Sequence, residues 1–243
     1  MDIVGVIPAR YASSRLPGKP LADICGKPMI WWVYQQAIKV TDFAKVVVAT
    51  DSELVKEACD QYGLPVMMTR EDHPRHVDRV HEVSERLPAD FYVVVCGDEP
   101  LTSPETIRQV FPEPDDLQRQ YVVRSLMRTM DDPVEALHPS NIKAVVNSND
   151  ECLLLTRSMI PYPYKTLDFK FKKLVGIECF NKASLDFFAR NPMGVLEKIE
   201  DITLLRYIEN HITVKLIMTD AYQLGVDTPE DLERVVSIIS ARA

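Results

Sequence analysis

The feature of this sequence that most constrains its fold is a series of short runs in which almost every residue is apolar. These strand-length runs are residues 3–7, 45–50 ("KVVVAT"), 65–68 and 91–96 ("FYVVVC"). Segments with helical periodicity follow them, at residues 28–38, 52–63, 76–87 and 104–110. A strand that is apolar on both faces is typical of a parallel sheet covered by helices. The alternation therefore predicts an α/β, Rossmann-like, doubly wound and mostly parallel sheet with right-handed crossovers.

The pattern changes after residue 111. A Pro-acidic connector, "FPEPDD", leads into residues 121–180, which we interpret as several short strands with a Pro-Tyr loop at 160–164. The remaining predicted elements are helices at 182–190, 195–210 and 228–240 and a strand at 212–218. We therefore predict one domain over residues 1–243, with a β-rich arm inserted at approximately 121–180. Apolar runs at 152–155 and 174–177 exceed what a small arm buries alone, which predicts a homodimer through this arm.

Composition excludes several classes of function. Acidic residues outnumber Lys and Arg by 36 to 28, for a net charge of −8, whereas DNA and RNA binding require a basic surface. No stretch approaches the roughly 18 apolar residues of a membrane span. The start of the chain does not resemble a signal peptide, so we expect a cytoplasmic protein. The five cysteines are scattered without a C-x-x-C pair, which predicts reduced thiols.

Positive charge is concentrated in one loop of this acidic chain. The segment "PARYASSRLPGKP" at residues 8–20 contains Arg10, Arg15 and Lys19, together with two serines and a Pro-Gly turn. An exposed basic loop is one interpretation. Cations and hydroxyls in a shaped loop after a strand also suit a phosphate group.

Ligands of open α/β sheets bind beyond the carboxyl ends of the strands. "CGDEP" at 96–100 follows a buried strand, and we expect its glycine to let the backbone approach a ligand at Asp98. Asp227 precedes the last helix, and Thr50 or Asp51 is expected to cap the helix at 52–63. Two carboxylates and a cationic loop are what a magnesium-nucleotide site requires.

Seven segments then carry a family resemblance: "IPARYASSRLPGKPLADICGKPMI", "VVVATDSE", "MTREDH", "GDEP", "TRSMIP", "LEKIEDITLLR" and "GVDTPEDLE". In this order they resemble the motifs of the 3-deoxy-manno-octulosonate (Kdo) cytidylyltransferases, or CMP-Kdo synthetases, over essentially the whole chain. The resemblance implies a single nucleotidyltransferase domain with a dimerising β-arm. It further implies Mg²⁺ as cofactor and transfer from CTP to the anomeric hydroxyl of a small acidic acceptor, a 2-keto-3-deoxy sugar acid, with release of pyrophosphate.

The resemblance also implies roles for individual residues. The implied catalytic residues are Arg10, Lys19 and Asp98. The implied nucleotide-binding residues are Pro8, Ala9, Arg10, Arg15, Lys19, Arg70 and Asp98. The implied magnesium ligands are Asp98 and Asp227. The implied acceptor side contains Arg157, Glu200 and Arg206, although Glu200 and Arg206 are also consistent with solvated charges on one amphipathic helix.

The chain departs from the family pattern on the acceptor side. Cys96 replaces a glutamine, "PRHV" at 74–77 replaces Gln-Ser-Gly-Thr, and Leu174 and Glu178 replace a histidine and a tyrosine. Each buried hydroxyl left unpaired costs about 1–3 kcal/mol, so these changes predict a preference for an acid other than unmodified Kdo. The added acceptor-binding candidates are Arg75, His76, Cys96 and Glu178.

Alternatives remain open. A Kdo-type acid is the predicted acceptor class, and an amino-substituted ulosonic acid or a small phosphonate is the alternative; Arg75 and His76 pointing to solvent would favour Kdo itself. A hexose-1-phosphate nucleotidyltransferase would be expected to contain a G-x-G-T-R loop, which this sequence lacks. A catalytically inactive homologue is disfavoured by the retained Arg10, Lys19, Asp98 and Asp227. The histidines at 73, 76 and 81 lack a convincing zinc-ligand spacing.

Overall fold

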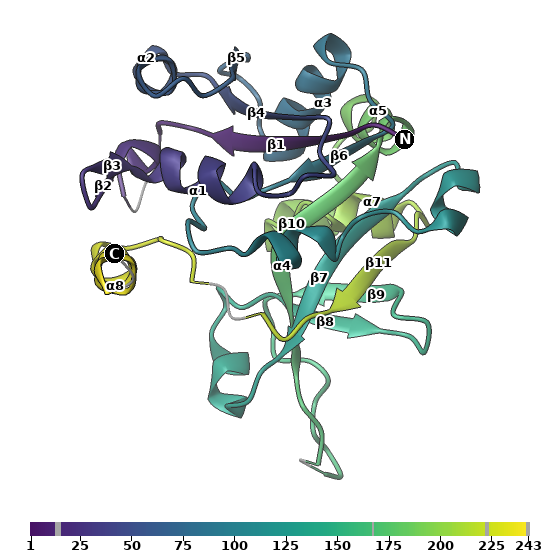
Figure 1. Ribbon diagram of the computed structural model, residues 1–243. Coiled ribbons are helices and arrows are strands. Elements are labelled where there is room, and N and C mark those ends of the chain that lie inside the picture. The colour runs from purple at the N-terminus through teal and green to yellow at the C-terminus, as the bar shows by residue number, and fades with distance from the viewer. Residues whose placement is uncertain (13–15, 167, 222–223, 242–243) are drawn as a thin grey trace. The chain divides into compact units, whose positions relative to one another are not determined.

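The computed structural model describes residues 1–12, 16–166, 168–221 and 224–241. The chain forms two compact units (Figure 1). The first unit consists of Met1–Arg108 with Tyr222–Ala243, and the second unit of Gln109–Ala221.

The first unit contains a parallel sheet. Its elements are β1 (Ile3–Ala9), the 3₁₀ helix η1 (Lys19–Leu21), β2 (Asp23–Ile24), β3 (Lys27–Pro28), α1 (Met29–Ala37), β4 (Lys45–Thr50), α2 (Glu53–Gln61), β5 (Val66–Met68), α3 (His76–Arg86), β6 (Phe91–Val94), α4 (Pro104–Arg108) and α8 (Pro229–Ser240). Strand β1 pairs in parallel with β4 and β6, and β4 pairs in parallel with β5. The predicted parallel α/β fold is confirmed.

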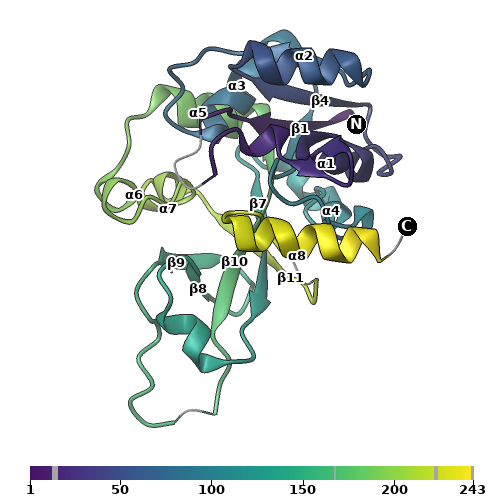
Figure 2. The same ribbon diagram turned by 90° about the vertical axis from the view of Figure 1, so that its left-hand side faces the viewer.

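The strands of the parallel sheet are apolar on both faces because helices cover them. Helices α1 and α3 both contact β1 and β4, from opposite sides of these strands (Figure 2). The strand residues between them, such as Val6, Ile7 and Val48, are fully buried. Because the strands are parallel, the carboxyl ends of β1, β4, β5 and β6 meet at one edge of the sheet, and the loops that follow them are brought together there.

The second unit is built on a mixed sheet. Its elements are η2 (Pro114–Gln118), β7 (Val123–Thr129), η3 (Pro133–Leu137), β8 (Lys143–Val146), β9 (Cys152–Thr156), β10 (Lys172–Asn181), α5 (Lys182–Arg190), α6 (Val195–Glu200), α7 (Leu205–Glu209) and β11 (Val214–Met218). Strands β10, β8 and β9 pair antiparallel, as do β10 and β7, whereas β11 is parallel to β7. Residues 121–180 lie within this unit, and their role as an inserted arm stays a prediction.

Two local predictions were wrong. The helix predicted at 195–210 is divided into α6 and α7, because Asp201 adopts a left-handed conformation with φ of 54° and ends α6. Helix α2 is capped by Ser52, whose side chain accepts from the Val55 N–H, and not by Thr50 or Asp51. Asp51 instead forms an ion pair with Arg79 at 2.5 Å.

Within the described residues, the helices are all too short or too polar to cross a membrane.

Candidate active site

Three charged side chains meet at the carboxyl edge of the parallel sheet. Lys19 begins η1, Asp98 follows β6, and Asp227 lies just before α8. The Lys19 Nζ donates to Asp98 Oδ2 at 2.9 Å and to Asp227 Oδ1 at 2.8 Å. The structure therefore gathers a predicted phosphate-binding cation and both predicted magnesium ligands, which are up to 208 positions apart in the sequence.

Backbone contacts hold the two carboxylates in place. The Val226 N–H donates to the Asp98 carbonyl at 2.9 Å, which ties the segment before α8 to the loop after β6. Gly97 is required for close packing, because a Cβ atom there would lie 2.6 Å from the Pro8 carbonyl oxygen. The contact with β1 is thus one reason for a glycine here, and its role in a ligand's approach stays a prediction.

The start of α8 directs Asp227. Thr228 and Asp231 form a capping box, and Asp231 Oδ2 also accepts from the Asp227 N–H at 3.2 Å. The helix donors are therefore satisfied by Asp231 and Thr228. The carboxylate of Asp227 is left to face Lys19.

The cluster is partly screened from solvent. The Lys19 side chain is 13% exposed. Burial lowers its pKa, but Asp98 and Asp227 outweigh this effect and the pKa is raised, so Lys19 is a cation. Burial and the neighbouring charge of Asp98 raise the pKa of Glu99 to about 8, so this carboxyl is mainly protonated at neutral pH.

The two aspartates fit a magnesium ion shared with a nucleotide. Mg²⁺ is commonly held by one or two carboxylates, with water and substrate phosphates completing its octahedral shell. The Lys19 ammonium shows that one cation reaches oxygens of both aspartates. Among the described residues no group of three or more His, Cys, Asp or Glu gathers as metal ligands, so the remaining ligands would come from water and substrate.

The other predicted nucleotide-binding residues lie at the same sheet edge. Arg10 directly follows β1, is half-buried, and donates from Nη2 to the His73 carbonyl. Burial and the charge of Arg79 lower its pKa. Arg70 is more exposed and forms an ion pair with Asp72 at 3.3 Å. Arg15 lies outside the described residues.

Of the predicted acceptor residues, three belong to the first unit. Arg75 and His76 stand at the start of α3, and Cys96 follows β6. All three are half-buried. Whether Arg75 and His76 face the site or point to solvent stays a prediction.

In the second unit, Arg157 and Glu200 come together. The Glu200 carboxylate accepts from Thr156 Oγ1 at 2.6 Å and from the Arg157 N–H at 2.8 Å, and Arg157 Nε donates to the Glu200 carbonyl at 2.5 Å. Burial opposes ionisation of Glu200, but the hydrogen bonds from Thr156 and Arg157 outweigh it and its pKa is lowered. Sequence reasoning missed the neighbouring Lys143, which is fully buried and whose pKa is lowered by burial and by the charge of Arg157.

Arg206 has a different environment from Glu200. Its guanidinium donates to both carboxylate oxygens of Glu197, at 2.6 and 2.7 Å, and stacks 3.6 Å from the centre of the Phe188 ring. The pair is buried, so the interpretation of Arg206 as a solvated charge is wrong. The geometry favours a structural role, and acceptor binding by Arg206 stays a prediction. Glu178 is likewise buried, at a bulge in β10.

Known proteins resemble this chain over its full length. The cytidylyltransferase family model matches residues 4–217. A 3-deoxy-manno-octulosonate cytidylyltransferase of Lawsonia intracellularis is 40% identical over 242 residues, which cover 98% of this chain and 94% of that protein. The chain belongs to the 3-deoxy-manno-octulosonate cytidylyltransferase family. An Escherichia coli member is 38% identical, covering 97% of this chain and 95% of that protein.

Solved structures agree with this family membership. A CMP:2-keto-3-deoxy-manno-octonic acid synthetase complexed with CTP is 38% identical, covers all of both chains and superposes with a TM-score of 0.94. A cytidylyltransferase of Leptospira borgpetersenii, 18% identical with a TM-score of 0.62 over 99% of this chain and 87% of that one, shares the fold. The predicted family resemblance is confirmed.

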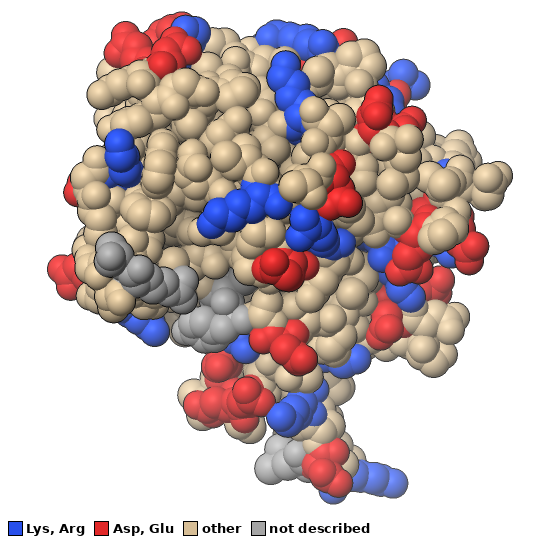
Figure 3. Space-filling view, viewed as in Figure 1, with Lys and Arg blue, Asp and Glu red and all other residues tan. Residues whose placement is uncertain are grey.

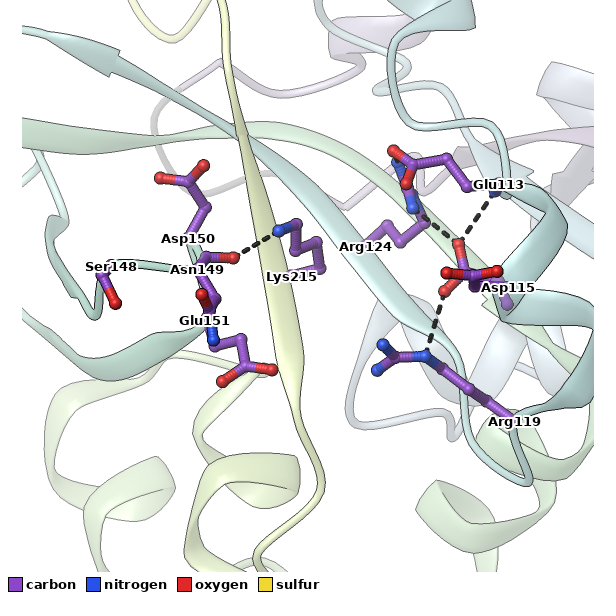
Figure 4. A pocket seen from close by; sticks show the side chains of 10 residues that line it. Glu113, Asp115, Arg119, Arg124, Ser148, Asn149, Asp150, Glu151 and Lys215 are labelled. Atoms are coloured by element: carbon purple, nitrogen blue, oxygen red, sulfur yellow. Dashed lines mark hydrogen bonds and ion pairs between the residues drawn. The ribbon is translucent and has the colours of Figure 1, made fainter.

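One hollow of the second unit is lined by none of the predicted site residues. It has a volume of about 460 Å³ in the second unit. Its lining is Glu113, Asp115, Asp116, Arg119, Arg124, Ser148, Asn149, Asp150, Glu151 and Lys215 (Figure 4). Arg124 is buried between Asp116, at 2.6 Å, and Glu113, at 2.8 Å. The lining holds five carboxylates and three cations, so the hollow keeps an excess of negative charge.

Charge is mixed in sign on one face of the molecule. On the face drawn in Figure 3, Lys and Arg side chains lie beside Asp and Glu and do not form one continuous basic surface.

Proposed function

We propose that this chain transfers a cytidylyl group from CTP to a Kdo-type 2-keto-3-deoxy sugar acid, with Mg²⁺ as cofactor. The observation that carries the proposal is the contact of Lys19 with Asp98 and Asp227 at the carboxyl edge of the parallel sheet. Family membership supports it, since relatives named for this activity match almost the whole chain.

The reaction requires stabilisation of phosphate charge. The anomeric hydroxyl oxygen of the acceptor attacks the α-phosphorus of CTP, a new P–O bond forms, and the bond to the β-phosphate's bridging oxygen breaks. Pyrophosphate leaves, and the hydroxyl proton is released. Arg10 and Lys19 stabilise the charge that builds on the phosphate oxygens, and no covalent enzyme intermediate is needed.

Asp98 and Asp227 are the residues that would hold magnesium. When bound, the ion neutralises triphosphate charge and orients the phosphates.

The acceptor carries a carboxylate and several hydroxyls, so it needs both cations and hydrogen-bonding groups. Arg157 and Glu200 of the second unit are proposed for this role, although the Arg157 guanidinium already donates to the carbonyls of Pro139, Glu200 and Asp201. The half-buried Arg75 and His76 keep a small phosphonate as an alternative acceptor. The buried Glu178 is the residue that would pair with the amino group of an amino-substituted ulosonic acid.

A pyrophosphate-release assay tests the proposal. CTP, Mg²⁺ and Kdo are expected to give turnover, and Kdo is compared side by side with amino-substituted ulosonic acids and small phosphonates. Asp98→Asn and Asp227→Asn are expected to fold normally and to lose about 10²–10³-fold in kcat, because each removes charge that the phosphate site uses. Glu230→Gln, at an exposed position in the first turn of α8, is the matched control.

Near-normal turnover of either aspartate variant at saturating Mg²⁺ would remove that residue from the magnesium site. If the wild-type protein shows no turnover with any of these acceptors, the proposed function is refuted. If a small phosphonate or an amino-substituted ulosonic acid gives a higher kcat/KM than Kdo, that acid replaces Kdo as the proposed acceptor.

We also propose that the protein is a cytoplasmic homodimer that associates through the predicted arm. The apolar runs at 152–155 and 174–177 support this less than expected, because Cys152, Leu155, Val175 and Ile177 are buried in the chain itself. Support comes instead from large apolar side chains of the arm that are exposed: Val134, Leu137, Leu153, Tyr162 and Tyr164.

A further inference from the structure

The loop between β5 and α3 carries the contact that holds Arg10. Arg10 Nη2 donates to the main-chain carbonyl of His73, 63 positions later in the sequence. Four other residues of this loop, Arg70, Glu71, Asp72 and Pro74, are exposed. Together with the attraction of Asp51 and Asp78, what fixes this largely exposed loop therefore helps to set the position of the Arg10 guanidinium.

One buried carboxylate fixes the loop at two points. Oε2 of Glu82, on α3, accepts from the Arg70 N–H at 2.9 Å and contacts His73 Nε2 at 2.5 Å. Its other oxygen, Oε1, accepts from Arg86 one helical turn further on. Burial opposes the charge on Glu82, but these hydrogen bonds outweigh it and its pKa is lowered, so the carboxylate is ionised.

The anchored side chain of His73 determines how the main chain of the loop is oriented. Its side chain is only 5% exposed and points inward to Glu82. With the ring anchored, the main chain at residue 73 presents its carbonyl to Arg10. At the start of the loop, the buried Arg79 donates to Thr69 Oγ1 and to Asp51, so α3 holds this end of the loop as well.

We propose that Glu82 and His73 are positioning residues for Arg10 and act on the cytidylyl transfer through it. The inference rests on the proposed function, in which Arg10 binds the phosphates of CTP. A displacement of about 1 Å in a phosphate-binding group can cost roughly 100-fold in rate. Loss of either residue is therefore expected to lower the reaction rate without any direct contact between that residue and the substrate.

A double-mutant cycle tests the proposal. Glu82→Gln keeps the shape of the side chain but removes its charge, and it is combined with Arg10→Ala. We expect Glu82→Gln alone to lower kcat/KM by about 10- to 100-fold. In the Arg10→Ala background the same change is expected to have almost no further effect, because the group that it positions is absent.

Controls separate this role from a general structural one. Glu85→Gln makes the same chemical change at an exposed position of α3 and is expected to behave as wild type. His73→Phe, which retains a ring but loses Nε2, is expected to give the same non-additive pattern as Glu82→Gln. Thermal unfolding of every variant shows whether it is folded at the assay temperature.

Two results would overturn the inference: a folded Glu82→Gln protein with wild-type kcat/KM, or a full loss by Glu82→Gln in the Arg10→Ala background. If Glu82→Gln fails to fold, the same comparison is made with His73→Phe. If neither variant folds, Glu82 and His73 are required for the fold itself and the proposal is refuted.

The dissociation constant for CTP is measured across the same cycle. Wild-type protein that binds CTP without turnover refutes the proposed function, while the binding cycle still tests the positioning of Arg10. Wild-type protein that neither binds nor reacts refutes both.

Discussion

At the scale of single residues, the site is a balance of charges of opposite sign. Lys19 touches two carboxylates, and its ammonium is kept charged by them despite its burial. Replacing one aspartate leaves Lys19 paired with the other, whereas replacing Lys19 leaves two carboxylates together without their cation.

Gly97 offers a residue-scale prediction about stability. A Cβ at this position would lie 2.6 Å from the Pro8 carbonyl oxygen, and this main-chain atom cannot move without displacing β1. Gly97→Ala is therefore expected to lower the free energy of unfolding by about 1–3 kcal/mol. Urea denaturation monitored by circular dichroism measures the change.

Gly225→Ala is the control for this prediction. Its Cβ would meet only the Glu99 Cγ at 3.9 Å, an ordinary van der Waals contact. Equal stability of the two alanine variants would show that the close approach of β1 and β6 is not what requires a glycine at 97.

At the scale of elements, caps and breaks determine where functional side chains stand. The capping box of α8 turns Asp227 toward Lys19. The left-handed Asp201 separates α6 from α7. Glu200, at the end of α6, contacts β9, whereas Arg206, on α7, points into the buried interior of the same unit and pairs with Glu197.

The buried pair of Arg206 and Glu197 gives the element-scale prediction. Arg206→Met leaves the Glu197 carboxylate buried without its partner, so the free energy of unfolding is expected to fall by about 3–5 kcal/mol. The double variant Glu197→Leu/Arg206→Met is expected to recover much of this loss, because no charge remains buried. Equilibrium urea unfolding compares the two.

Arg190→Met, at an exposed position of α5, serves as the control. An Arg206→Met protein of wild-type stability with a raised KM for the acceptor would assign Arg206 to acceptor binding and remove the structural role.

At the scale of the whole molecule, the prediction concerns association. Light scattering at micromolar concentration is expected to give about twice the 27.7 kDa mass of the chain. Replacing Tyr162 and Tyr164, which are 76% and 85% exposed, by serine is expected to shift dissociation to higher concentration, because aromatic anchors often dominate interfaces.

Leu117→Ser is the matched change outside the predicted arm, at a side chain that is 53% exposed. A monomeric wild-type protein contradicts the homodimer. A dimer unaffected by the tyrosine changes but weakened by Leu117→Ser places the interface elsewhere.

The sequence by itself determined the parallel core and most element positions. Runs such as "KVVVAT" can bury both faces only between helices, and β4 and the helix at 182–190 lie where their patterns predict. Family motifs, ordered along the whole chain, also brought Lys19, Asp98 and Asp227 into one hypothesis before any contact was known.

Only the tertiary structure decided which partner each charge has. Periodicity does not distinguish the buried Glu82 from the exposed Glu85, and it did not show that His73 would turn its carbonyl to Arg10. The same limit explains the wrong interpretation of Arg206 and of the helix at 195–210. Hydrophobic periodicity and helix caps can be recognised in a short stretch of sequence. Ion pairs and close main-chain contacts join residues that are distant in the chain, and they form only when folding brings the loops together at the sheet edge.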